Sequence, residues 1–261
     1  MKGIAAAVRP WLCFGAIMLV ACHSTMARGG QGISGRDIGQ YAFKYLGLTI
    51  AQGSIAVSES TAGNGSPLTV LEARAASSPA TSFLFRIDNH YTTVIDGLTG
   101  YPVLYTKSIA QTNFREETTL HFSRDRLWGH GQDTLSLPQP AHTLFSALFV
   151  LLNHRFQPRE VLHLPVYAAG QIWTAAAEAV RLEKVTTPLG PHSAVLVEIR
   201  FSPAALVDAS QRETDVLTNR LISEAKTTRL WISRGPDPLL VKSEYALYPG
   251  ALQMILTGHG P

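Results

Sequence analysis

The sequence predicts a mainly antiparallel, all-β fold with one helix. Three observations predict it: apolar and polar residues alternate in most segments, glycine and proline punctuate the chain at short intervals, and a single apolar run near residues 141–155 has no such alternation. The 21 glycines and 15 prolines follow no collagen-like period and exclude a long coiled coil. With 46% hydrophobic and 16% charged residues, the chain can form a core, which excludes wholesale disorder.

The first predicted strands are rich in aromatic and small residues. Residues 41–45 place aromatic side chains at alternate positions, as a half-buried strand requires. Gly47 and Gly53 interrupt the apolar run that follows and predict a bulge or a sharp bend. Asn64-Gly65 is a turn signal, and residues 68–75 predict the next strand.

The middle of the chain predicts a run of antiparallel strands with one solvent-exposed face. We expect these strands at residues 83–95, 101–109, 114–122 and 126–130, with turn residues after the first of them at 96–100. In the third strand, Leu120 and Phe122 share one face, whereas Arg115 and His121 share the other.

The helix is predicted at residues 141–155, after Pro138 and Pro140. Its leucines and phenylalanines cover most of the circumference, which favours a buried core helix across an open sheet. The apolar run from Leu144 to Leu152 is too short to span a bilayer, which needs about 20 residues.

The C-terminal part again predicts a β-meander. Residues 175–179 fit a helical turn as well as a strand, and residues 203–218 predict a polar insertion. The expected strands are 161–167, 171–185, 194–201, 220–224, 228–233, 239–248 and 251–256.

The N-terminus predicts export. Lys2 and Arg9 precede the uncharged stretch Trp11–Ala21, as in a signal peptide. Leu19-Val20-Ala21-Cys22 is similar to the bacterial lipobox, in which the cysteine is acylated, and the alternative is simple secretion with cleavage after Ala27.

These features predict three regions: a signal peptide with lipobox at 1–21, a flexible tether at 22–39 and one β-rich domain at 40–257. His23 follows Cys22, and an Asp there would imply retention in the inner membrane, so we expect an outer-membrane lipoprotein facing the periplasm; the alternative is a soluble periplasmic protein. The lipid anchor on Cys22 is the expected membrane partner.

Charge and cysteine content exclude other classes. Removing residues 1–21 takes away two of the 22 basic residues and none of the 19 acidic ones, which leaves a net charge near +1 and no dedicated nucleic-acid surface. The only cysteines are Cys13 and Cys22, so the predicted domain has no disulfide.

The lack of common catalytic motifs in the sequence predicts a non-catalytic protein without metal or cofactor. The sequence has no G-x-S-x-G, H-E-x-x-H, G-x-G-x-x-G or P-loop motif. The nearest polar cluster is His121, Asp125 and His130, but His121 and Asp125 would lie about 13 Å apart along a strand, too far to share one ion. A solvated face is the favoured interpretation.

Three tryptophans of the predicted domain raise a second question about ligands. Trp128, Trp173 and Trp231 could stack against a sugar, although tryptophan in a β-domain more often fills the core.

The order of features resembles the exported bacterial domain-of-unknown-function family numbered 3108, over about residues 40 to 257. The motifs that carry the resemblance are Tyr41-Ala42-Phe43-Lys44-Tyr45, the run Asp96–Pro102, Ser146-Ala147-Leu148, Leu230-Trp231-Ile232-Ser233 and Gly250. The chain departs from the family pattern at Gln139–Thr143, where an acidic residue is expected, and at Arg234, where Asp is usual. The resemblance implies a large antiparallel sheet folded on itself into a half-barrel, and no reaction.

Two functions follow as hypotheses. The first is a non-catalytic envelope lipoprotein that binds a hydrophobic or glycan ligand or docks another envelope component. The second is a hydrolase or metal-dependent enzyme that acts on an envelope polymer through the region of His121, Asp125 and His130.

Overall fold

The computed structural model describes residues 35–83, 86–112, 114–129, 135–168, 170–206, 222 and 226–260. Fourteen strands and one helix occupy these ranges. In chain order they are β1 (Gly35–Tyr45), β2 (Leu48–Thr61), β3 (Pro67–Ser77), β4 (Ile87–Asp96), β5 (Pro102–Gln111), β6 (Phe114–Phe122), β7 (Arg126–Gly129), β8 (Leu135–Ser136), α1 (Leu144–Asn153), β9 (Val161–Ala168), β10 (Gln171–Thr187), β11 (Gly190–Leu206), β12 (Thr227–Ser233), β13 (Leu240–Leu247) and β14 (Gly250–Gly258).

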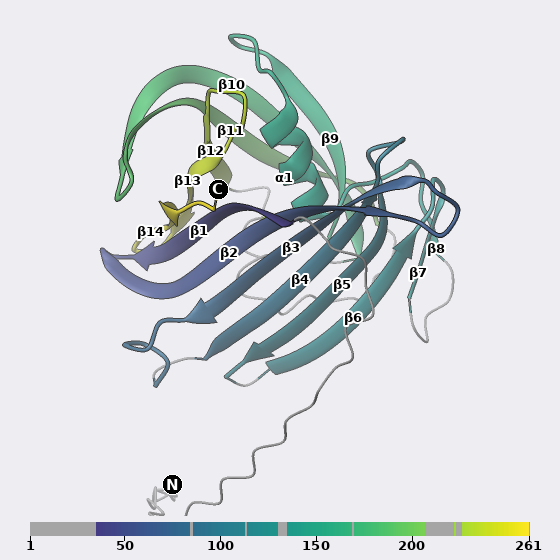
Figure 1. The fold of residues 1–261 in the computed structure, drawn as a ribbon, viewed down its shortest axis with the longest axis horizontal. Helices are drawn as coiled ribbons and strands as arrows, with labels where there is room; N and C mark the ends of the chain where they lie inside the picture. The colour runs from purple at the N-terminus through teal and green to yellow at the C-terminus, as the bar shows by residue number, and fades with distance from the viewer. Residues whose placement is uncertain are drawn as a thin grey trace, which may run out of the picture. The chain divides into compact units, whose positions relative to one another are not determined.

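The strands form a single antiparallel sheet made of two meanders. The sheet order is β8-β7-β6-β5-β4-β3-β2-β1-β14-β13-β12-β11-β10-β9, so β1–β8 and β9–β14 each run in sequence order and β1 pairs with β14. Figure 1 shows the second meander curling back over the first, with α1 between them. The predicted all-β half-barrel with one apolar helix is confirmed.

Alternation along the strands separates an inner face from an outer face. In β4 every second side chain from Ile87 to Ile95 is buried, and in β3 the buried side chains are Leu71, Ala73 and Ala75. This period of two is what the sequence shows, because a sheet buried on one face selects apolar residues at alternate positions. The inner faces of both meanders contribute to one core.

The helix begins at a buried capping box. Thr143 accepts a hydrogen bond from the backbone N–H of Ser146 at 3.1 Å, and the Ser146 hydroxyl accepts one from the backbone N–H of Thr143 at 2.9 Å. The Thr143 hydroxyl also lies 3.2 Å from that of Thr93 in β4. Because the helix start is buried against the sheet, hydroxyls rather than an acidic side chain satisfy its backbone donors, which explains the departure at Gln139–Thr143.

α1 packs its apolar side chains into the core, and Ala147, Leu151 and Leu152 are buried there. Within the part of the chain that the structure describes, no helix has the length and apolar character needed to cross a membrane.

Two local predictions need correction or refinement. Phe83 lies in a turn, with 78% of its surface exposed, and the strand predicted at 83–95 begins only at Ile87. Residues 175–179 belong to β10, so the strand interpretation of this ambiguous segment is correct. Most of the predicted insertion at 203–218 lies outside the described residues.

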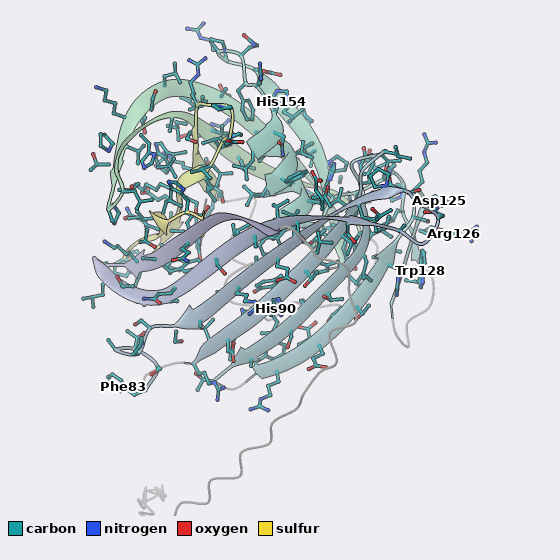
Figure 2. All side chains as sticks on the ribbon, viewed as in Figure 1. Phe83, His90, Asp125, Arg126, Trp128 and His154 are labelled. Atoms are coloured by element: carbon teal, nitrogen blue, oxygen red, sulfur yellow. The ribbon has the colours of Figure 1, made fainter. Side chains whose placement is uncertain are left out.

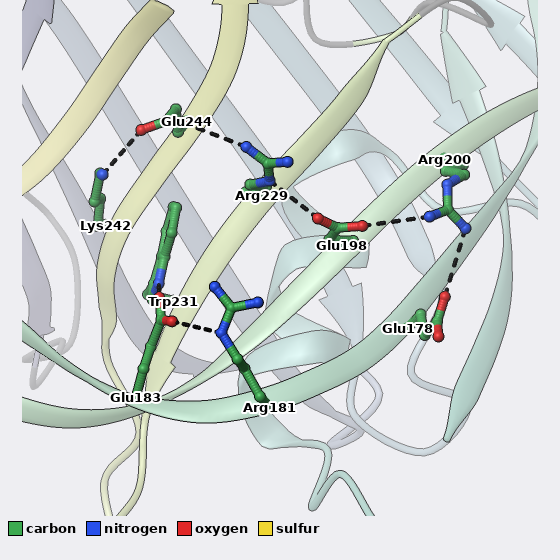
Figure 3. A network of polar contacts seen from close by, with 9 residues as sticks. All are labelled: Glu178, Arg181, Glu183, Glu198, Arg200, Arg229, Trp231, Lys242 and Glu244. Carbon is green, nitrogen blue, oxygen red and sulfur yellow. Dashed lines mark hydrogen bonds and ion pairs between the residues drawn. The ribbon is translucent and has the colours of Figure 1, made fainter. Parts of the chain in front are cut away.

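The outer face of the second meander carries a continuous set of ion pairs (Figure 3). Arg200 bridges Glu178 of β10 and Glu198 of β11, at 3.5 and 3.3 Å. Arg229 of β12 continues the chain from Glu198, at 3.0 Å, to Glu244 of β13, at 3.7 Å. Lys242 of β13 ends the chain, 2.9 Å from Glu244. We call this set of six side chains, from Glu178 to Lys242, the charge ladder.

Candidate binding cavity

An apolar hollow lies between α1 and the inner faces of the two meanders. It has a volume of about 170 Å³, and its lining is almost entirely apolar. The helix contributes five side chains to one wall, namely Leu144, Phe145, Ala147, Leu148 and Leu151. The strands contribute the opposite walls, among them Ile55, Tyr91, Leu164, Val166, Ile199, Phe201, Leu230, Leu252 and Met254.

Small residues on the strands create this space. Ala73 and Ala75 of β3 and Ala175 and Ala177 of β10 line the cavity and are buried. At these four positions an alanine faces a helix of large side chains, so the sheet approaches α1 without filling the gap between them.

Gly53 of β2 shapes the cavity wall at a second place. A Cβ atom at this position would lie 2.6 Å from the backbone oxygen of Arg74 and 2.8 Å from the ring of Phe43. Only glycine therefore allows the Phe43 ring to lie across β2 at the cavity wall.

Few polar groups reach the cavity lining. Tyr41 is 2% exposed, and its hydroxyl has no hydrogen-bond partner among the described residues. Burial raises the pKa of Tyr41 well above its ordinary value, so the hydroxyl is protonated at all physiological pH values. The Tyr91 hydroxyl accepts a hydrogen bond from Asn89 at 2.8 Å.

A partly buried ion pair lies on the same inner face, next to Tyr91 in the register of the sheet. Lys107 of β5 pairs with Tyr91 of β4, and its ammonium group lies 2.8 Å from Glu116 of β6. Glu116 also accepts from the Thr118 hydroxyl at 2.6 Å. The side chain of Lys107 is only 5% exposed, so its charge is compensated inside the domain rather than by water.

A second hollow of about 780 Å³ lies at the C-terminal end of α1, between residues 152–158 and the turn at 233–238. Arg155, Arg181 and Arg234 line it together with apolar and uncharged polar side chains, and none of the described residues that line it is a carboxylate. Glu160 organises the loop behind it, since its carboxylate accepts from His154 at 2.8 Å and from the backbone N–H of Gln157 at 2.7 Å. Both hydrogen bonds lower the pKa of the Glu160 carboxyl, and the bond from the Gln157 backbone has the larger effect.

The predicted polar cluster is only partly within the described residues. The His121 ring stacks on Trp128, with centroids 5.5 Å apart, and Asp125 is an exposed side chain 3.8 Å from Arg126. Figure 2 shows Asp125, Arg126 and Trp128 on the β7 side of the sheet. His130 lies outside the described residues, so the three-residue site stays a prediction. No group of three His, Cys, Asp or Glu side chains in the described ranges could hold a metal ion.

The three tryptophans differ in environment. Trp231 is 7% exposed and donates its indole N–H to Glu183, and Trp173 donates to the backbone oxygen of Ala168 at 3.3 Å. Trp128, at 38%, is the exposed one. Trp173 packs against the main core, and Trp231 is buried in a separate cluster on the outer face, whereas Trp128 presents an aromatic face to solvent.

Sequence reasoning missed the cavity itself. Its signal is present in the alternate alanines at 73, 75, 175 and 177, because alanine at consecutive inward positions removes side-chain volume from a face that must meet a helix. Only the sheet order shows that these two segments face the same helix. The predicted lipidation residue, Cys22, lies outside the described residues.

The fold and the cavity define a class of protein: an open antiparallel half-barrel that holds one helix against its inner face. The family model described as protein of unknown function (DUF3108) matches residues 40–257, and the chain belongs to that family. The resemblance drawn from the motifs is thus confirmed. Among curated proteins, none matches the chain.

Solved structures with similar folds are distant in sequence. A β-barrel-like protein of a domain of unknown function (DUF1849) from Brucella abortus is 9% identical, with a TM-score of 0.52, over 85% of this chain and 95% of that one. A candidate exported protein with a YmcC-like fold from Bacteroides fragilis is 12% identical, with a TM-score of 0.37, over 87% and 95%. A candidate lipoprotein from Parabacteroides distasonis is 14% identical, with a TM-score of 0.31, over 85% and 95%. The first of these similarities supports the fold alone.

Proposed function

We propose that this protein is a non-catalytic, exported envelope protein that binds the apolar part of a lipid-like ligand in the cavity beneath α1. The observation that carries the proposal is the cavity lining, which combines leucine, isoleucine, phenylalanine and alanine side chains with a few hydroxyl groups. Binding sites for small apolar molecules have this composition.

The size of the cavity limits the ligand. An engineered protein cavity of about 150 Å³ stays dry and accepts benzene. The cavity of about 170 Å³ therefore holds a hydrocarbon group of similar size, such as the end of one acyl chain, while the polar part of the amphiphile stays outside. A glycan needs many hydrogen-bonding partners, which this lining lacks, so the hydrophobic ligand is the better supported of the two hypotheses.

The proposal is tested by filling the cavity from one strand. Ala75 of β3 lines the cavity, whereas the adjacent Ala76 points to the outer face and is exposed. We expect Ala75→Leu to weaken binding of a fluorescent fatty-acid probe by roughly tenfold or more, because the added carbons occupy the space of the ligand. Ala76→Leu adds the same atoms outside and is the matched control, with unchanged binding expected.

Two results would count against the proposal. One is equal probe affinity of the wild-type protein and Ala75→Leu when circular dichroism shows both to be folded. The other is the absence of any co-purified lipid in native mass spectrometry of wild-type protein isolated from its envelope.

The cellular location is part of the proposal and has its own test. The basic and apolar N-terminus supports export, and Cys22 in a lipobox-like context supports an outer-membrane anchor. We expect a triacyl-sized mass addition on the protein expressed with its leader, lost together with membrane attachment in Cys22→Ala. An unmodified mass that begins at Arg28 would instead indicate a soluble periplasmic protein.

A further inference from the structure

Two turns from distant parts of the sequence lie side by side at one end of the sheet. Tyr45, at the end of β1, pairs with Leu48 of β2 on one side and with Leu252 of β14 on the other. The Tyr45 hydroxyl donates to the backbone oxygen of Tyr248 in the β13–β14 turn at 3.0 Å. Leu46 lies directly over Gly250, where a Cβ atom would be 2.9 Å from its side chain.

These turns expose three large apolar side chains. Leu46 is 61% exposed, Leu48 69% and Tyr248 96%, and we call this group the apolar tip. The two turns, residues 45–48 and 247–250, contain no charged side chain, and the nearest charged residues in the register are Lys44 and, beyond Gln253, Glu244. The apolar tip is therefore an uncharged, exposed end of the sheet.

The backbone conformation of the β1–β2 turn does not favour leucine at position 46. Leu46 and Gly47 have φ values of 50° and 83°, so both residues of this two-residue hairpin turn are left-handed. Asn-Gly is the favoured pair for such a turn, and a bulky aliphatic residue is disfavoured at positive φ. The turn conformation does not favour leucine here, and its contact with Gly250 still leaves 61% of its surface exposed and able to meet a partner.

The shape and area of the apolar tip select the kind of partner. Two leucines and one tyrosine, even when fully covered, supply less than the ~800 Å² per partner of a standard protein interface, since a large aromatic side chain buries only about 150–250 Å². Side chains that project from tight turns cannot enclose a small ligand. They can insert between lipid headgroups, where the ring of a tyrosine lies in the apolar layer and its hydroxyl in water.

We propose that the apolar tip docks the protein on the surface of a phospholipid bilayer. Leu252 and Tyr245, which pair with each other next to the tip, also line the cavity, so the docked end of the sheet is the end at which the cavity wall begins. The inference extends the proposed function, since a lipid-like ligand would come from that surface. The docking itself does not require the cavity.

The test is flotation with vesicles of phosphatidylethanolamine and phosphatidylglycerol. Every protein compared, including the reference called wild type in this test, carries Cys22→Ala, so that no acyl anchor contributes. We expect Leu46→Asn and Leu48→Asn each to lower the vesicle partition coefficient by roughly tenfold, as loss of one buried leucine implies. Leu46→Asn should also raise the melting temperature, because asparagine tolerates the left-handed conformation.

Leu98→Asn is the matched control. Leu98 lies in the β4–β5 turn and is 76% exposed, so it is as accessible as the leucines of the apolar tip. Partition of Leu98→Asn at the wild-type level supports the proposal. Equal loss in Leu98→Asn, wild-type partition of both tip variants, or no partition of the wild-type protein would overturn it.

The two proposals fail separately in this design. If the cavity binds ligand but the tip does not dock, Leu46→Asn and Leu48→Asn behave as wild type in flotation while Ala75→Leu still weakens probe binding. If only the docking is correct, Ala75→Leu leaves both probe binding and flotation unchanged, and the tip variants lose flotation.

Discussion

The two meanders use the same antiparallel pairing but have different outer faces. In the β9–β14 meander, the charge ladder joins neighbouring strands from Glu178 of β10 to Lys242 of β13. In the β1–β8 meander, by contrast, outer pairs such as Arg74 with Glu72 lie within one strand, 3.7 Å apart, with both side chains well exposed.

The second meander also has a small apolar cluster on its outer face. Trp231 packs there with Ala194, Leu196 and Val241. The Lys242 ammonium lies 4.4 Å from the centroid of the Trp231 ring. The indole N–H of Trp231 donates to the Glu183 carboxyl, and this hydrogen bond is the largest of several effects that lower the pKa of Glu183. The cluster joins β11, which with β10 is the longest strand of the sheet at 17 residues, to β12 and β13.

Removing one tryptophan from the outer face of each meander tests the difference between the two faces, and we expect it to have the largest effect. We expect Trp231→Ala to lower the free energy of unfolding by ~3–5 kcal/mol, as for a buried tryptophan, and Trp128→Ala by less than ~1 kcal/mol, because Trp128 is already exposed at 38%. Urea unfolding measures both. Equal losses would show that the two outer faces contribute equally.

The junction between the meanders gives a prediction for pH. His142 precedes α1, is 5% exposed and stacks on Tyr101 with centroids 4.7 Å apart. Burial lowers the pKa of His142 to about 4 from an ordinary value of 6.5. The unfolded chain therefore binds more protons between these values, so stability is full above pH 6.5 and is lost as the pH falls towards 4, by as much as ~3 kcal/mol.

A substitution isolates this effect. His142→Phe keeps the stacking on Tyr101 and cannot take up a proton, so its unfolding free energy should change less than that of the wild type between pH 6.5 and 4. The measurement is chemical denaturation across that range. Parallel pH profiles of the two proteins would refute the assignment to His142.

The smallest expected effect sharpens the difference between the charge ladder and an isolated pair. Glu198 is 18% exposed at its side chain and accepts from Arg200 and Arg229, so we expect Glu198→Gln to cost about 1 kcal/mol. Glu72→Gln in the isolated pair should cost less than ~0.5 kcal/mol. Denaturation at low and high salt compares the two, and equal, salt-independent costs would contradict a cooperative network.

Sequence patterns predicted the strands because one face of each strand is buried. The expected strand at 114–122 has the same bounds as β6, and the helix predicted at 141–155 contains α1. The strand start at 83 was wrong because Phe83 has the parity of the strand but lies in an exposed turn, and parity alone does not mark where a strand begins.

The candidate sites depended on contacts that a linear pattern does not contain. Lys107 shares the parity of apolar neighbours, yet only the register with β6 shows that Glu116 neutralises it. The apolar tip likewise needs the pairing of β1 with β14, which brings Tyr45 and Tyr248 together across 203 positions of sequence. The alternating pattern predicts which face a residue occupies, and the topology decides which residues meet there.

The pairing of the first strand with the last has a consequence for biosynthesis. Each meander can form from neighbouring hairpins as the chain emerges, whereas the pairing of β1 with β14 must wait until β14 has been synthesised. A chain without residues 250–258 would leave β1 and β13 as unpaired edge strands, each able to pair with another molecule. The nine-residue strand β14 thus decides whether the two meanders join into one sheet, since no other strand pairing among the described residues links them.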